Sequence, residues 1–177
     1  VMEVGSGIAD FTIGRDLTLS STNIFTQVAI ASNKENLTGG SLQFTVERNV
    51  SLLATDTSSL CLIGFSTVSN AANVAGDILF HHVGGDLILE GANNIGPGNF
   101  GFAQIGHISF LSLTEPVTLN GNISLLVDGS ISLVGGSASE TSYAQIGHGG
   151  LYPFITTGQV TAIAGKNIVM QSNTGSA

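Results

Sequence analysis

Charged residues are scarce in this sequence. Only 9% of the 177 residues are charged, and four basic residues against twelve acidic ones give a formal net charge of −8. Binding to a nucleic-acid backbone or to an anionic membrane surface requires clustered Lys or Arg. The composition therefore argues against nucleic acid and against a charged membrane surface as partners.

Cysteine and long apolar runs are equally sparse. The single cysteine, Cys61, excludes an internal disulfide framework. No apolar run approaches the roughly 20 residues of a membrane-spanning helix, so we expect no transmembrane segment. The first residues do not read as a basic and then apolar leader, and we expect any export signal to lie outside this sequence.

Glycine and β-branched residues dominate what is present, and a short motif recurs among them. Phe-Ala-Gln-Ile-Gly-His at 102–107 returns within 142–150 with Tyr143 in place of the Phe, and looser copies occupy 60–65 and 27–32. Successive copies are 33, 42 and 41 residues apart. Repetition at such intervals predicts stacked supersecondary units.

Two further families of segments alternate apolar and other residues at period two, which is typical of strands with one buried face. One family comprises residues 16–19, 49–52, 86–89, 130–133 and 167–170. The other comprises residues 9–13, 42–46, 78–80, 123–125 and 160–162. The two families keep an offset of eight residues, except for one of nine at the His81-His82 pair, where we expect a β-bulge.

Three strand families per repeat predict an all-β fold: a parallel, right-handed, three-faced β-helix of about four and a half coils, each of roughly 33 to 45 residues. Residues 1–177 would form one segment that enters and leaves mid-coil, with Val4-Gly5 at the end of a motif-family strand. The longest connection contains Ile108 to Leu119, which would form an extra strand or a flap.

Like aliphatic residues are expected to stack in columns inside the coils. The predicted columns are Leu17, Val50, Leu87, Ile131 and Ile168; Leu19, Leu52, Leu89, Leu133 and Met170; and Ile30, Ile63, Ile105 and Ile146. Cys61 falls in a further inward column of small residues. A polar column of Asp16, Asn49, Asp86, Ser130 and Asn167 precedes one strand family, and we interpret it as structural, because Asx side chains bond backbone amides at turns.

A three-faced parallel β-helix whose strands begin with Gly-Asp and whose corners carry Asn or Gly resembles filamentous-haemagglutinin-like exoproteins and autotransporter passengers, and the Ala-Gln-Ile-Gly-His-Gly-Gly phrase at 144–150 looks like a repeat of such proteins. This resemblance implies a structural or adhesive segment of an exported, filament-forming protein at the cell surface (outer-membrane-associated) or outside the cell. Carbohydrate or a host or cell surface would then be a partner. Because the ends offer no cap or charge run, we also expect them to meet further coils of a longer chain or another copy.

Candidate sites are few. His107 and His148 share a motif position, and the alternatives are a shared metal ion or corner packing, with packing favoured because zinc requires three or four protein ligands. Gln104 and Gln145 alternate with inward residues and should face outward beside Phe102 and Tyr143. The predicted outer-face contact residues are Phe102, Gln104, His107, Tyr143, Gln145 and His148.

Catalysis is not expected. Glycoside chemistry uses paired carboxylates, but Asp86 and Glu90, four residues apart on one strand, would be roughly 13 Å apart. We therefore predict no catalytic residues, no cofactor and no metal. The alternative function is a carbohydrate-binding or polysaccharide-cleaving β-helix.

Overall fold

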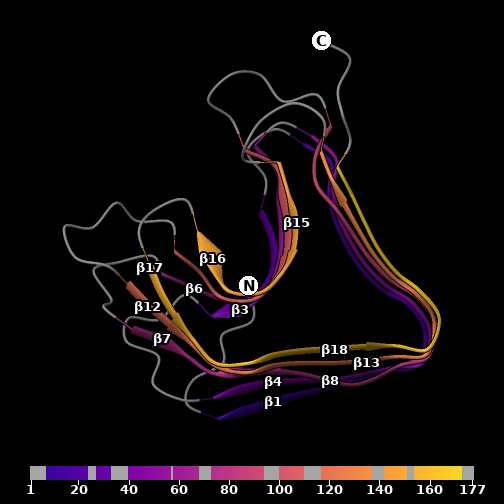
Figure 1. Ribbon diagram of the computed structural model, residues 1–177, viewed down its shortest axis with the longest axis horizontal. Coiled ribbons are helices and arrows are strands. Elements are labelled where there is room, and N and C mark those ends of the chain that lie inside the picture. Colours follow the sequence, from indigo (N-terminus) through magenta and orange to yellow (C-terminus); the bar gives the residue numbers. More distant parts are fainter. Residues whose placement is uncertain are drawn as a thin grey trace.

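The chain forms a parallel β-solenoid (Figure 1). The structure is a computed structural model that describes residues 7–23, 27–32, 40–56, 58–67, 73–93, 100–109, 117–136, 142–150 and 154–172. Within these ranges all regular structure is β-strand, and no helix is present. The strand ending at Val4-Gly5 that the sequence predicts lies outside the described residues.

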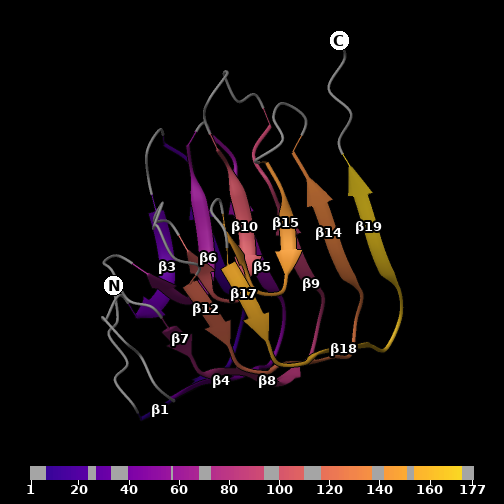
Figure 2. The same cartoon turned by 60° about the vertical axis from the view of Figure 1, so that its left-hand side comes forward.

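Two walls run the whole length of the solenoid, and every strand pair in them is parallel. Wall A contains β1 (Ile8–Ile13), β4 (Ser41–Val46), β8 (Asp77–Val83), β13 (Ile123–Val127) and β18 (Val160–Ala164). Wall B contains β2 (Leu17–Ser21), β5 (Val50–Ala54), β9 (Leu87–Glu90), β14 (Ile131–Gly135) and β19 (Ile168–Ser172). Figure 2 shows the strands of wall B side by side, with β19 outermost.

Wall C carries the recurring motif. It contains β3 (Gln27–Ser32), β6 (Leu60–Thr67), β10 (Phe102–Ile105) and β15 (Ala144–Ile146). The short strands β11 (Ile108–Ser109) and β16 (Gly149–Gly150) extend it beyond a sharp corner, where β11 pairs with the end of β6 and β16 pairs with β11. The three predicted strand families are therefore confirmed as walls A, B and C.

A fourth, short wall departs from the three predicted faces. Wall D contains β7 (Asn73–Ala75), β12 (Val117–Asn120) and β17 (Phe154–Thr157). The expected extra strand between Ile108 and Leu119 corresponds to β11 and the start of β12. Because wall D has three strands, about three turns are complete in every wall, slightly fewer than the four and a half coils predicted.

The predicted aliphatic columns are confirmed by the strand register. Leu17 pairs with Val50, Val50 with Leu87, Leu87 with Ile131 and Ile131 with Ile168. The Leu19 and Ile30 columns follow the same register. Their central members are buried, so each coil covers the apolar side chains of the next, as in other solenoids.

Wall A adds an aromatic column that lies inside the coils. The Phe11 and Phe44 rings stack with centroids 4.9 Å apart, and Phe44 and Phe80 stack at 4.5 Å. Immediately after Phe80 the register shifts, because Phe44 pairs with Phe80 whereas Thr45 pairs with His82. His81 is thus the extra residue, and the predicted bulge is confirmed.

The predicted polar column forms a ladder at the corner between walls A and B. The Asp16 carboxylate accepts hydrogen bonds from the Asn49 amide N–H and side chain, at 3.1 and 3.0 Å. Asn49 Oδ1 accepts from the Asp86 N–H, and Asp86 Oδ1 accepts from the Ser130 N–H, each at 2.8 Å. Each side chain therefore fixes the backbone of the following coil, which accounts for short polar residues at this position.

We expect Ile105→Asp to lower the free energy of unfolding by more than about 4 kcal/mol, because it places an unpaired carboxylate at a fully buried position between Ile63 and Ile146. Ser124→Asp, on an exposed outward position of wall A, is the control and should change it by less than about 0.5 kcal/mol. Urea unfolding measures both. An equal loss of stability in the two variants would contradict the assignment of Ile105 to the interior of the coils.

Candidate functional site

The recurring motif forms the corner at which wall C folds back. Gly106 separates β10 from β11, and Gly147 separates β15 from β16, with φ angles of +153° and +150°. A Cβ on Gly106 would lie 1.9 Å from the Gly147 carbonyl oxygen, and one on Gly64 would lie 2.0 Å from that of Gly106. The glycine of the motif is therefore required by both backbone conformation and close coil stacking.

The motif histidines point from this corner across to the glycines between walls D and A. His107 Nε2 lies 2.7 Å from the Gly76 carbonyl oxygen, and its Nδ1 accepts from the Phe65 N–H at 3.3 Å. His148 repeats the arrangement, with Nε2 at 2.8 Å from the Gly121 oxygen and Nδ1 accepting from the His107 N–H at 3.1 Å. Both rings are thus neutral, with the proton on Nε2 donated to a carbonyl.

The two imidazole rings stack on each other with centroids 4.4 Å apart. Burial, together with the adjacent His148 ring, lowers the pKa of His107 to about 3. Burial also lowers the pKa of His148. Protonation of either ring would place a charge in the buried corner and break the hydrogen bond that its Nδ1 accepts from a backbone N–H. Both rings are therefore neutral in the folded protein.

A shared metal ion does not fit these rings. Both nitrogens of each ring are already engaged by backbone groups, and a metal would have to displace one of those partners. Within the described ranges, no group of three or more His, Cys, Asp or Glu side chains could hold an ion. The geometry supports the packing interpretation of the histidine column.

Two glutamines hold the same corner from its other side. Gln104 Nε2 donates to the carbonyl oxygens of His107 and Gly147, at 3.1 and 3.0 Å. Gln145 Nε2 donates to the His148 carbonyl oxygen at 3.1 Å. Gln and His of the motif are therefore one unit that satisfies the backbone groups freed where the strand bends.

The expectation that the outer-face residues are available to a ligand is wrong for three of the six. Phe102, Gln104 and His107 are fully buried, whereas Tyr143, Gln145 and His148 are half-buried. The reason is the fold-back after wall C, which forms a hook whose concave side is filled by a second apolar cluster of Leu60, Leu62, Phe102 and Ile108. Tyr143 stacks on Phe102 with centroids 4.8 Å apart, and its hydroxyl donates to Gln104 Oε1.

A second polar ladder was not predicted. Asp77 Oδ1 accepts from the Asn122 N–H at 2.7 Å, and Asn122 Oδ1 accepts from the Gln159 N–H at 3.1 Å, where wall D meets wall A. The signal was present in the sequence, since each of these residues follows a glycine, as in the Gly-Asp corner before wall B. Gly40 precedes Ser41 in the same way.

Comparison with protein-family models, with curated proteins and with solved structures found no match to this chain. In the described part of the chain no helix is long and apolar enough to cross a membrane. The function proposed below therefore depends on the geometry of the chain and on the resemblance of its motifs.

We expect Gly106→Ala to lower the melting temperature strongly, because the new methyl group meets the Gly147 carbonyl and the backbone φ disfavours alanine. Gly14→Ala is the matched control, since a Cβ there has no atom within 4 Å. Thermal unfolding of the two variants beside the wild type tests this. A Gly106→Ala protein as stable as Gly14→Ala would show that the corner relaxes.

The histidine pair predicts a loss of stability in acid. The folded pKa of both rings is lowered below the unfolded value near 6.5, so their contribution is complete above about pH 6.5 and is lost as the pH falls toward the folded pKa. His107→Phe, which copies Phe65 of the preceding coil, should be less stable at neutral pH yet show a smaller decline in acid. Free energies of unfolding measured across a pH series test this. If the free energy of unfolding falls with decreasing pH as steeply in His107→Phe as in the wild type, the histidines are not the origin of the acid sensitivity.

Proposed function

We propose that this chain is a structural or adhesive segment of an exported protein that forms filaments at the cell surface or outside the cell. The single observation that carries the proposal is the continuous inter-coil stacking, in which aliphatic columns and backbone ladders extend through walls A and B. Such a fold gains its stability from neighbouring coils rather than from a central site. The motif resemblance to surface exoproteins supplies the location.

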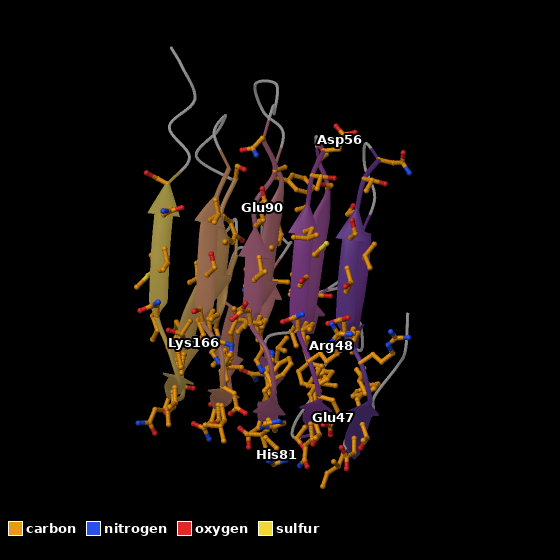
Figure 3. The ribbon with its side chains drawn as sticks, turned by 90° about the vertical axis from the view of Figure 1, so that its right-hand side faces the viewer. Glu47, Arg48, Asp56, His81, Glu90 and Lys166 are labelled. Carbon is orange, nitrogen blue, oxygen red and sulfur yellow. The ribbon has the colours of Figure 1, made fainter. Side chains whose placement is uncertain are left out.

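The distribution of charge supports a scaffold role. Figure 3 shows Arg48, Glu90 and Lys166 on separate coils of the face that carries wall B, with Asp56 near one edge. Arg48 and Asp16 come within 3.8 Å, yet both side chains are substantially exposed, so this pair contributes little. Charged residues make up only 9% of the chain, which suits broad, weak contact with other surfaces rather than selection of one charged ligand.

A catalytic role has no support from the best pair of carboxylates. Asp86 Oδ1 accepts the Ser130 N–H, so this side chain belongs to the corner ladder. Glu90 lies at the far end of β9, the strand that follows Asp86. The proposal therefore assigns the chain no catalytic residues.

The alternative is a carbohydrate-binding or polysaccharide-cleaving β-helix. Sugar binding at the motif column would need accessible aromatic and amide groups, but Phe102 and Gln104 are buried. Tyr143 and Gln145 are half-buried and so remain partly accessible. This alternative is weaker. It would be supported if the chain is retained on insoluble polysaccharides and if Tyr143→Ala abolishes that retention.

Antibodies raised against the folded chain should label intact, unpermeabilised cells of the producing organism or the material they shed. A cytosolic protein probed in parallel, which should remain unlabelled until permeabilisation, is the control. Labelling of this chain only after permeabilisation would contradict the proposed location.

A further inference from the structure

The two histidines of the Gly-His corner connect wall C to the step between walls D and A. His107 Nε2 donates to the Gly76 carbonyl oxygen at 2.7 Å, and its Nδ1 accepts the Phe65 N–H of the preceding coil at 3.3 Å. His148 makes the same two contacts one coil later, to the Gly121 oxygen and the His107 N–H. Each neutral ring therefore links a coil of wall C both to the coil before it and to the start of wall A.

The segment that these rings hold in place is short. It consists of residues 64–67, 106–109 and 147–150, here called the fold-back, and its strands β11 and β16 have two residues each. Figure 1 shows β16 turning away from β15 toward β17. Walls A and B instead have five strands each, of four to seven residues. Because two-residue strands are paired over so little length, opening the fold-back costs less free energy than separating walls A and B.

Protonated rings do not fit the closed fold-back. An imidazolium donates from both nitrogens, so the Phe65 N–H and the His107 N–H would each face another N–H instead of an acceptor. The His107 and His148 rings stack with centroids 4.4 Å apart, and two positive charges at that separation repel each other in a buried corner. The charged rings are therefore better accommodated in an open fold-back, where water reaches them.

The elements packed against the rings offer no carboxylate as a partner for them. Within the described ranges, each of the other titratable groups on these elements makes its contact elsewhere. These contacts are Asp77 with the Asn122 N–H, Tyr143 with Gln104 Oε1, Cys61 with the Leu19 and Leu53 carbonyl oxygens, His81 with Gln43 Oε1, and His82 with Asp128. The strongest electrostatic influence that one ring has is the other ring.

We infer that the Gly-His corner is an acid-sensitive switch, in which protonation of His107 and His148 opens the fold-back while walls A and B stay paired. The second apolar cluster, which is buried on the concave side of the hook in the closed form, then becomes accessible. The inference is independent of the proposed location and adds to the chain an apolar surface that is present in acid and absent at neutral pH.

The switch responds in a range of pH in which walls A and B are stable. The rings are neutral above about pH 6.5, where the closed form has its full stability, and that stability declines as the pH falls toward their lowered pKa. In the ladder between walls A and B, hydrogen bonds from Asn49 hold the pKa of Asp16 below its usual value, so this carboxylate is still ionised at about pH 4.5. The aliphatic columns of these walls contain no titratable group.

Amide hydrogen exchange at about pH 7 and about pH 4.5, expressed as protection relative to an unstructured peptide at the same pH, is the test. On acidification the amides of Phe65 and His107 should lose at least about tenfold in protection. Those of Val50, Leu87 and Ile131 should change by less than about threefold. The fluorescence of anilinonaphthalene sulfonate, a dye that binds exposed apolar surface, should rise over the same interval.

Two variants separate the corner histidines from the others. The double variant His107→Phe with His148→Phe, which repeats Phe65 of the earlier coil, should show protection at Phe65 that does not change with pH. His81→Gln, which removes an exposed histidine of wall A, is the matched control and should respond to acid as the wild type does. If the double variant is already open at neutral pH, nitrogen NMR shifts of the wild-type His107 ring decide, because its protonation should share a midpoint with the loss of protection at Phe65.

Four results would overturn the inference. Unchanged protection at Phe65 and His107 in acid would show that the corner stays closed. A loss of the same size in walls A and B would indicate global unfolding, and a full acid response in the double variant or a separate midpoint for the His107 ring would place the origin elsewhere. Lost protection without a rise in dye fluorescence would show that the apolar cluster stays covered.

Discussion

Parallel pairing between coils, with like aliphatic residues stacked in register, is the constraint on which the rest of the structure depends. One such column contains Leu17, Val50, Leu87, Ile131 and Ile168, and its three inner members are almost fully buried. A slip of one residue in any strand would turn its apolar side chains outward. The Asp16–Asn49–Asp86 ladder prevents such slips, because each side chain binds the amide of the next coil.

The Gly-His corner solves the problem of a strand that must bend sharply without leaving backbone groups unpaired. Glycine permits the bend, and the following histidine reaches 31 residues back in the sequence to the Gly76 carbonyl. Gln104 satisfies two further carbonyls. Three residues of the motif therefore serve architecture, which explains why the most conspicuous repeat of the chain does not form an exposed site.

The sequence predicted those features that repeat at a fixed offset. The inward columns, the corner ladder and the bulge at His81 follow from counting residues between like segments, because parallel stacking converts a constant offset into contact. Wall D was not predicted as a wall, although an extra strand was expected near β12, because its strands are short and their connections vary in length. The burial of Phe102 and Gln104 could not be predicted, because alternation places them outward and the fold-back that covers them is a tertiary feature.

The central claim, that coils pair in this register throughout, is tested most directly by amide hydrogen exchange of the dilute chain followed by NMR. The account predicts that the amides of Val50, Leu87 and Ile131, which donate to the next coil, exchange only through global unfolding. In β19 it predicts alternation, with Val169 protected by β14 and the amides of Ile168 and Met170 exchanging rapidly. Rapid exchange at Leu87 or uniform protection along β19 would contradict it.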